Sequence, residues 1–330
     1  TGVQTCALPI LVKTTPPKGR AFINFDLKGI RDLFVQNVEP ENQVADKLVT
    51  YSALPSENAV FAGLNNEQLA AVKYVAGPSL IIAGPGTGKT KTLTAKIAWL
   101  IENRLARPDE ILAVTFTNKA AGELKERLQA LLRNKADTGK VTVATFHAFG
   151  LLLLKEFYAA FGRTNQFLLA GETLRLDIIQ HILGGTRDEA KKLAAGFSEI
   201  KKGSAAETTD FRHYEDELQK MDAFDLDDLL EKPLHLFLQN EDILIRFREK
   251  FRYVHVDEYQ DTNETQYRLL RLLSPGADPN LCVVGDANQS IYSFRGGSAG
   301  YISKFTDDYP NAGYRKSTRL NSSHRIRSRM

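Results

Sequence analysis

The sequence predicts an α/β fold, in which a parallel sheet carries helices on both faces and a small helical subdomain is inserted into the chain. The first observation is an apolar run, a glycine-rich loop and an amphipathic segment in succession at residues 80–101. The second is a pair of mostly apolar runs, at 253–256 and 281–284, that each lead towards an aspartate. The third is residues 151–222, which resemble helices separated by turns rich in glycine, serine and threonine. Such apolar runs are typical of strands buried on both faces of a parallel sheet.

The glycine-rich loop has the pattern that binds nucleotide phosphates. Residues 80–90 read LIIAGPGTGKT, and Ala83 to Thr90 fit G-x-x-x-x-G-K-[ST] with alanine in place of the first glycine. Glycines let backbone N–H groups turn inward around phosphate oxygens, and the N-terminus of the following helix adds partial positive charge. Lys89 is expected to reach the β- and γ-phosphates, and Thr90 to offer its hydroxyl to Mg²⁺. The predicted contacts with ATP are Gly84, Pro85, Gly86, Thr87, Gly88, Lys89 and Thr90.

A pair of carboxylates follows the second apolar run. Residues 251–262 read FRYVHVDEYQDT, so a strand that includes Tyr253 and Val256 would end at Asp257. ATPases with a phosphate loop place a carboxylate on Mg²⁺, usually at the end of another buried strand. We therefore expect Asp257 to hold Mg²⁺. The adjacent Glu258 is the candidate for the catalytic base that accepts a proton from the attacking water.

The third apolar run leads into LCVVGDANQSIYSFRGG, residues 281–297. Gln289 is a candidate sensor of the γ-phosphate. Tyr292, Phe294 and Arg295 are candidates for contact with nucleic acid, because aromatic faces and guanidinium planes stack on unpaired bases. The spacing alone is equally consistent with a buried tyrosine and phenylalanine beside an exposed arginine.

The order of these motifs resembles that of UvrD/Rep-type superfamily 1 DNA helicases, over residues 64–314. The resemblance implies a RecA-like P-loop NTPase sheet, an ATP-driven motor that moves along single-stranded DNA with 3′→5′ polarity, and action at single/double-strand junctions. A cytoplasmic setting is expected separately, because two cysteines fit a reducing compartment. The segments that carry it are LNNEQLAAV (64–72), AGPGTGKT (83–90), VTFTNKAAGELKERL (114–128), TFHAFG (145–150), DLDDLL (225–230), VDEYQDTN (256–263) and VVGDANQSIYSFRGG (283–297).

The resemblance also implies roles for single residues. Gln68 would read the adenine, and Lys91 occupies the position where the family often has an arginine that stacks on it; lysine is a poorer planar stacker. Gln289 would couple the γ-phosphate to the DNA. The residues expected beside single-stranded DNA are Phe116, Asn118, His147, Tyr292, Phe294 and Arg295. Without the resemblance, Phe116 would be a core residue and His147 a histidine bonded to backbone at a helix start.

The resemblance divides the chain into a RecA-like domain, called 1A, and a helical insertion, called 1B. Domain 1A comprises residues 64–150 and 223–314, and 1B comprises residues 151–222. Within 1B, Lys201 and Lys202 are candidate phosphate contacts, or the end of a solvated helix. Residues 11–63 form an N-terminal extension of unknown role.

The two ends of the sequence are related to each other. A DNA that encodes TGVQTCALPI, residues 1–10, can be written so that its complementary strand encodes RKSTRLNSS, residues 315–323. That DNA resembles a common sequencing-library adaptor. We expect residues 1–10 and 315–330 to be translated adaptor, and the native protein to continue into a second RecA-like domain that supplies arginines to the γ-phosphate. The alternative is a natural basic arm at residues 315–330.

Composition limits the function classes. The 330 residues include 43 basic and 40 acidic side chains, and residues 315–330 hold six of the basic ones; without them 37 basic residues face 40 acidic ones. DNA binding would therefore come from a local patch. Two cysteines exclude a disulfide framework, and no apolar run is long enough to span a bilayer, so we expect no membrane partner.

Three other functions remain open. The chain would be the motor of a RecB- or AddA-type helicase–nuclease if a nuclease follows it. It would be a DNA-binding module if its nucleotide site is idle. It would be a small-molecule kinase if its nucleotide turnover does not respond to single-stranded DNA. For a helicase fragment that lacks the second RecA-like domain, we expect weak binding of Mg–ATP and slow hydrolysis.

Overall fold

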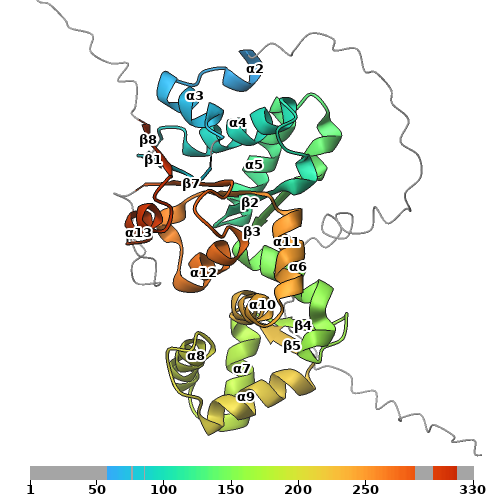
Figure 1. Ribbon diagram of the computed structural model, residues 1–330. Coiled ribbons are helices and arrows are strands. Elements are labelled where there is room, and N and C mark those ends of the chain that lie inside the picture. Colours follow the sequence, from blue (N-terminus) through green and yellow to red (C-terminus); the bar gives the residue numbers. More distant parts are fainter. Residues whose placement is uncertain (1–57, 76, 85, 287–299, 318–330) are drawn as a thin grey trace, which may run out of the picture. The chain divides into compact units, whose positions relative to one another are not determined.

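The structure is a computed structural model that describes residues 58–75, 77–84, 86–286 and 300–317, all within one compact unit (Figure 1). Six strands of the described residues form one sheet in the order β3–β2–β6–β7–β1–β8, and every neighbouring pair is parallel. The strands are β1 (Ser79–Ala83), β2 (Ile111–Thr115), β3 (Thr142–Thr145), β6 (Tyr253–Val256), β7 (Leu281–Gly285) and β8 (Gly313–Ser317). The predicted α/β class with a parallel sheet is confirmed.

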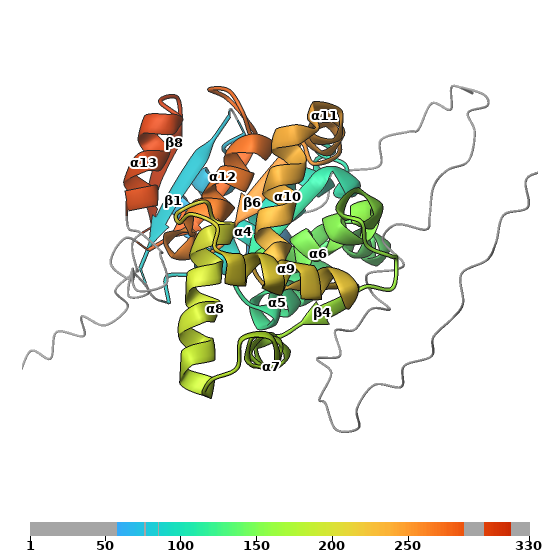
Figure 2. The ribbon, with the colours of Figure 1, turned by 90° about the horizontal axis from the view of Figure 1, so that it is seen from below.

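Helices cover both faces of this sheet. Figure 1 shows α3, α4 and α5 above the strands, and Figure 2, which looks from below, shows α10 and α12 in front of them. The helices of the sheet domain are α2 (Asn58–Phe61), α3 (Asn66–Lys73), α4 (Lys89–Glu102), α5 (Asn118–Leu131), α6 (Phe146–Phe157), α10 (Asp228–Gln239), α11 (Glu241–Lys250), α12 (Glu264–Leu273) and α13 (Gly300–Asp308). Short 3-10 helices are η1 (Pro108–Glu110), η2 (Lys135–Gly139), η3 (Tyr158–Phe161) and η4 (Tyr259–Asp261).

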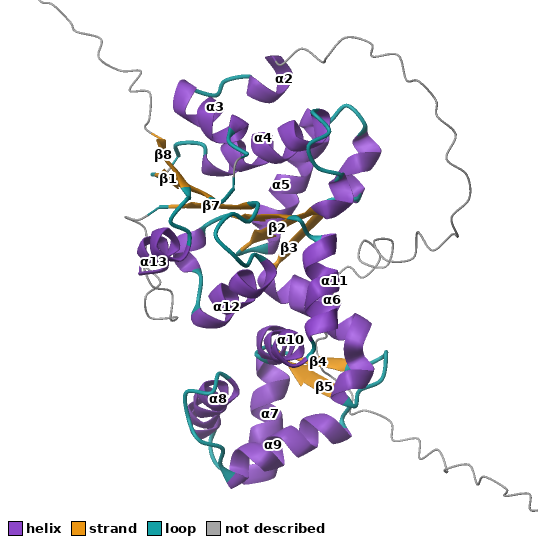
Figure 3. Ribbon diagram, in the orientation of Figure 1, coloured by secondary structure: helices purple, strands orange, loops and turns teal. Residues whose placement is uncertain are grey.

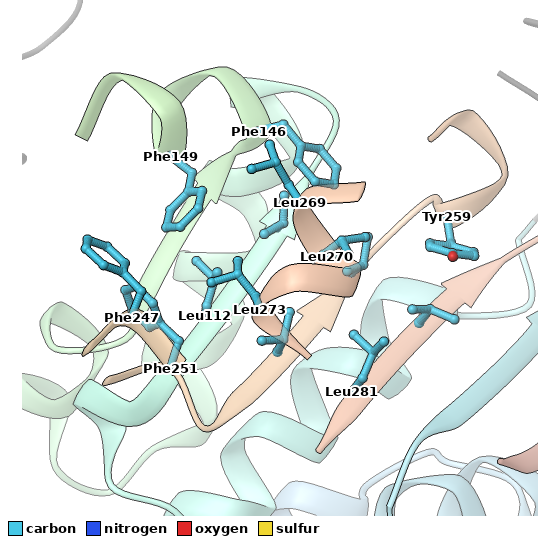
Figure 4. Close-up of a cluster of buried hydrophobic side chains, with 14 of the residues drawn as sticks. Leu112, Phe146, Phe149, Phe247, Phe251, Tyr259, Leu269, Leu270, Leu273 and Leu281 are labelled. Carbon is cyan, nitrogen blue, oxygen red and sulfur yellow. The ribbon is translucent and has the colours of Figure 1, made fainter. Parts of the chain in front are cut away.

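Alternate residues of each strand belong to different hydrophobic cores, because successive strand side chains point to opposite faces. Leu80 and Leu112 contribute to the core beneath α6, α10, α11 and α12, and Figure 4 shows part of that core. Ile81 and Ala113 contribute to the core beneath α4 and α5. A strand buried on both faces needs apolar residues at consecutive positions, and the runs in the sequence supply them.

A separate helical subdomain lies between α6 and α10 in the chain (Figure 3). It contains α7 (Glu172–Leu183), α8 (Arg187–Lys201) and α9 (Thr209–Lys220), together with a pair of parallel strands, β4 (Leu168–Ala170) and β5 (Ala223–Asp225). These three helices lie within residues 151–222, which the sequence predicted to be helical as a whole, whereas the two short strands were not predicted. The subdomain has its own hydrophobic core, in which Phe197, Phe211 and Tyr214 are packed together.

Two features lie near the predicted domain limits. Helix α6 runs across the limit at residues 150 and 151, so the sheet domain and the insertion share one helix. Strand β8 runs from Gly313 to Ser317 and thus includes the first three residues of the segment expected to be translated adaptor. Its pairing with β1 uses backbone groups. No helix of the described residues is both long and apolar enough to cross a membrane.

The contact between α6 and α10 depends on Gly150. A Cβ atom added to Gly150 would lie 1.6 Å from the carbonyl oxygen of Leu229, at the start of α10. We expect Gly150→Ala to lower the free energy of unfolding by about 1–3 kcal/mol or more, the usual cost of overpacking. Urea denaturation would measure it. The matched control is Gly122→Ala in α5, where nothing lies within 4 Å of the added Cβ. That variant should gain roughly 0.5–1 kcal/mol from helix propensity, and equal losses in both would contradict the packing argument.

Candidate active site

The phosphate loop joins the end of β1 to the start of α4. Gly86 and Gly88 have φ angles of 66° and 84°, which side chains other than glycine rarely adopt. The backbone N–H and the hydroxyl of Thr87 both donate to the carbonyl of Gly84, at 3.3 and 2.7 Å, and so close the turn. No described side chain caps the first turn of α4. The N–H groups of that turn can therefore bind an anion such as a phosphate.

Two side chains of this loop contact the carboxylates at the end of β6. Nζ of Lys89 lies 3.0 Å from Oε2 of Glu258, and the Lys89 side chain is only 8% exposed. The hydroxyl of Thr90 donates to Oδ2 of Asp257 at 2.8 Å. The carboxyl ends of parallel strands meet at one edge of a sheet, so β1 and β6 bring together residues 167 positions apart.

Asp257 and Thr90 fit a magnesium site. Mg²⁺ takes oxygen ligands, commonly one or two carboxylates completed by substrate phosphates and water. Asp257 is 2% exposed, and burial raises the pKa of its carboxyl, although the hydrogen bond from Thr90 opposes this rise. Among the described residues no three His, Cys, Asp or Glu side chains form a metal cluster. The protein would therefore hold the ion together with the phosphates of a nucleotide.

The residues predicted to contact adenine lie beside the phosphate loop. Nε2 of Gln68 donates to the carbonyl of Thr87 at 2.6 Å, and Oε1 accepts from the backbone N–H of Asn65 at 2.9 Å. Gln68 thus caps the start of α3 and fixes α3 against the loop. Lys91 donates from Nζ to the carbonyl of Gly63 at 2.8 Å. Both side chains therefore link the phosphate loop to the segment before it.

A cavity of about 330 Å³ lies at the carboxyl ends of β2 and β3. Phe116 and His147, both predicted to lie beside DNA, line it together. The Phe116 ring packs edge-on against Phe146, with 5.9 Å between the ring centroids. Asn118, the first residue of α5, is exposed and does not line the cavity. An aromatic face beside polar groups suits an unpaired base.

The segment after β6 adds lining residues that sequence reasoning did not single out: Asp261, Asn263 and Gln266. They follow Asp257 and Glu258 in the chain, so the segment after β6 contributes to both sites. Asn263 and Gln266 cap the start of α12 through reciprocal hydrogen bonds of 3.0 and 3.1 Å. The pattern N-x-x-Q before an apolar run was the available signal, but it indicates a helix start and not a ligand.

The predicted roles of Lys201 and Lys202 differ in outcome. Lys201 is neither a phosphate contact nor solvated, because its side chain is 4% exposed and its Nζ lies 2.8–3.0 Å from Glu215, Asp225 and Asp228. Burial lowers the pKa of Lys201, but these carboxylates outweigh burial and raise it overall. Lys202, which follows the last residue of α8, lies on the surface and pairs with Glu199 of that helix.

The carboxylates around Lys201 make further contacts. Asp225 and Asp228 each accept a hydrogen bond from the other's backbone N–H, and Arg175 lies close to Asp225. The buried ion cluster comprises Arg175, Lys201, Glu215, Asp225, Asp227 and Asp228. It joins α7, α8 and α9 to β5 and the start of α10. Burial raises the pKa of Asp228 to about 6. Such a cluster fixes the geometry of the subdomain, since each charge depends on its partners for solvation.

Some predicted site residues lie outside the described residues: Pro85, Gln289, Tyr292, Phe294 and Arg295. The same holds for residues 1–10 and for most of the expected extension at 11–63.

The fold and the nucleotide site together define a RecA-like phosphate-loop domain. The sequence matches the family described as "UvrD/REP helicase N-terminal domain" over residues 64–209 and 189–310. The chain belongs to this UvrD/Rep helicase family, as the motifs indicated.

Curated relatives in bacteria agree with this family. The ATP-dependent DNA helicase PcrA of Staphylococcus aureus (strain Mu50 / ATCC 700699) is 38% identical over 275 residues, which are 77% of this chain and 37% of that protein. PcrA of Leuconostoc citreum is 40% identical over 276 residues, 76% of this chain and 36% of the relative. The chain thus spans little more than a third of the length of these relatives.

Proposed function

We propose that the chain is part of an ATP-dependent DNA helicase, and that it supplies the ATP site and part of the path for single-stranded DNA. The observation that carries this proposal is the segment after β6. Its residues 257 and 258 contact the phosphate loop, and its residues 261, 263 and 266 line the cavity that holds Phe116 and His147. If nucleotide binding shifts this segment, the contacts in the phosphate loop and the shape of the cavity would change together. A motor protein needs contacts that differ between its nucleotide states.

The proposed chemistry follows from the contacts between the phosphate loop and the carboxylates after β6. Phosphates entering the loop would compete with Glu258 for the ammonium of Lys89, because both are anions within reach of the same donor. Glu258 would then be free to accept a proton from the attacking water. Asp257 and Thr90 would hold Mg²⁺, which neutralises charge that develops on the phosphates.

Finer features of the proposal rest on the family, apart from the cytoplasmic location, which rests on the small number of cysteines. They are 3′→5′ polarity, action at single/double-strand junctions, a cytoplasmic location and a second RecA-like domain whose arginines accelerate hydrolysis. They also include the division into 1A at residues 64–150 and 223–314 and 1B at 151–222. Slow hydrolysis by this chain alone is part of the same proposal, because arginine fingers contribute about 10³–10⁵-fold in rate.

The proposal is tested by two binding measurements on the 330-residue chain. Lys89→Ala should weaken binding of a fluorescent Mg–ATP analogue at least roughly tenfold, because a charged hydrogen bond to phosphate is lost. Phe116→Ala should weaken binding of labelled oligo(dT) by about 1–3 kcal/mol, the usual cost of a lost base stack. The control is Lys192→Ala, which removes an exposed lysine from α8. Nucleotide binding that survives Lys89→Ala unchanged would refute the site.

A further inference from the structure

Gln260 is a buried amide that joins the ends of two strands. It is 2% exposed and lies two residues after Glu258 in η4. Its Nε2 donates to Oε2 of Glu258 at 2.8 Å, and its Oε1 accepts from the backbone N–H of Asp286 at 2.9 Å. Both ends of the amide are therefore engaged. One end holds the predicted catalytic base, and the other holds the residue that follows β7.

Gly285, the last residue of β7, makes this contact possible. A Cβ atom at Gly285 would lie 2.9 Å from Oε1 of Gln260 and 3.4 Å from its backbone nitrogen. The φ of Gly285 is not in the left-handed region, so its lack of a side chain serves close approach rather than a turn. The structure thus leaves just enough room for the amide to reach the backbone of Asp286.

The carboxylate of Glu258 has two donors, and only one of them belongs to the phosphate loop. Oε2 of Glu258 contacts Nζ of Lys89 at 3.0 Å and Nε2 of Gln260 at 2.8 Å. When phosphates draw Lys89 away, Gln260 is the side-chain donor that remains among the described residues. The backbone of Glu258 is in the left-handed region, with φ 51°, which costs energy for a residue with a side chain. The direction of the carboxylate is therefore held by its surroundings.

We propose that Gln260 is a positioning residue for ATP hydrolysis, which orients Glu258 towards the attacking water and ties this orientation to the end of β7. This inference rests on the proposed function, because it assumes that Glu258 accepts the proton. The competing explanation is that Gln260 only satisfies the buried N–H of Asp286. The two explanations predict different behaviour when the two ends of the amide are changed separately.

The experiment compares Gln260→Met and Gln260→Glu in the 330-residue chain. Methionine has a similar length but neither the donor nor the acceptor. Glutamate keeps an acceptor for the Asp286 N–H and replaces the donor to Glu258 by a second carboxylate oxygen. The measurements are single-turnover hydrolysis of Mg–ATP with protein in excess, the Kd of a fluorescent ATP analogue, and the midpoint of thermal unfolding.

We expect both variants to hydrolyse ATP about 10–100-fold more slowly, as befits a lost hydrogen bond to a charged group. The Kd of Gln260→Met should stay within about twofold of that of the parent chain, because the described hydrogen bonds of the Gln260 side chain go to Glu258 and Asp286 and not to a predicted ATP contact. Gln260→Met should unfold at a lower temperature, because the N–H of Asp286 loses its acceptor. Gln260→Glu keeps that acceptor but brings a second carboxylate against Glu258, so it should also unfold at a lower temperature and stay slow. Parent-like hydrolysis in Gln260→Glu would overturn the inference and leave Gln260 a structural residue.

A Glu258→Gln chain measured in parallel separates this inference from the proposed function. If Glu258→Gln and the parent chain hydrolyse ATP equally fast, the role of Glu258 itself is wrong. If Glu258→Gln is slow and both Gln260 variants match the parent chain, only the positioning role is wrong.

Discussion

Replacing Glu258 by glutamine is expected to slow single-turnover ATP hydrolysis by about 10²–10⁴-fold, the range typical of a lost general base. The amide keeps the size of the side chain but cannot accept a proton from water. Nucleotide affinity should be unchanged or higher, because Lys89 no longer has a carboxylate partner at 3.0 Å to leave when phosphates bind. The measurement uses radiolabelled ATP with protein in excess, so that a slow rate remains visible.

The control for this variant is Glu241→Gln, which removes an exposed carboxylate from the first turn of α11. It should hydrolyse ATP at the parent rate. A Glu258→Gln chain that is as fast as this control would show that another group activates the water. A chain that loses nucleotide binding would show instead that Glu258 is needed to build the phosphate loop.

Replacing Lys201 by methionine is expected to lower the free energy of unfolding by about 3–5 kcal/mol, the cost of breaking a buried ion pair on one side. Lys201 lies within 3.0 Å of three carboxylates, and two of them, Asp225 and Asp228, are themselves fully buried. Without the ammonium these charges repel each other in a poorly solvated place. Urea denaturation followed by circular dichroism would measure the loss.

Two further variants make this prediction specific. Lys202→Met removes a neighbouring exposed lysine, whose pair with Glu199 at the end of α8 is worth only about 0.3–0.5 kcal/mol. Adding Asp228→Leu to Lys201→Met should restore part of the stability, because one unpaired buried charge disappears. Equal effects of Lys201→Met and Lys202→Met would mean that the buried ion cluster contributes little.

The sheet and the phosphate loop between β1 and α4 could be predicted because their geometry leaves few choices. A loop that wraps phosphate needs glycines at fixed spacing, and a parallel sheet needs continuous apolar strands, so both leave local patterns around Lys89 and Asp257. The family resemblance added predicted roles for Phe116 and His147, whose spacing alone is that of ordinary core and helix-start residues.

Other features leave no local pattern. Lys201 stands beside a glycine and serine turn at a helix end, where lysines are usually solvated, and its three partners come from α9, β5 and α10. Strands β4 and β5 are three residues long, too short to show a period. Gln260 looks like any polar residue in a loop, because its importance comes from Asp286, which is 26 positions away. The burial of Lys201, the pairing of β4 with β5 and the contacts of Gln260 all depend on residues that are distant in the sequence.

The strand order also determines the sequence in which the chain can fold. Strands β1 and β2 are consecutive in the sequence, but β6 and β7 lie between them in the sheet. As a ribosome releases the chain, β2 can pair early with β3, but β1 must wait without its native neighbours, and β2 without its second one, until residues 253–285 begin to emerge. The helical subdomain closes earlier, because the buried ion cluster draws only on residues 175–228. Non-local pairing of this kind folds slowly. During synthesis, chaperones are expected to bind the apolar strands that have emerged before β6 and β7 are available to pair with them.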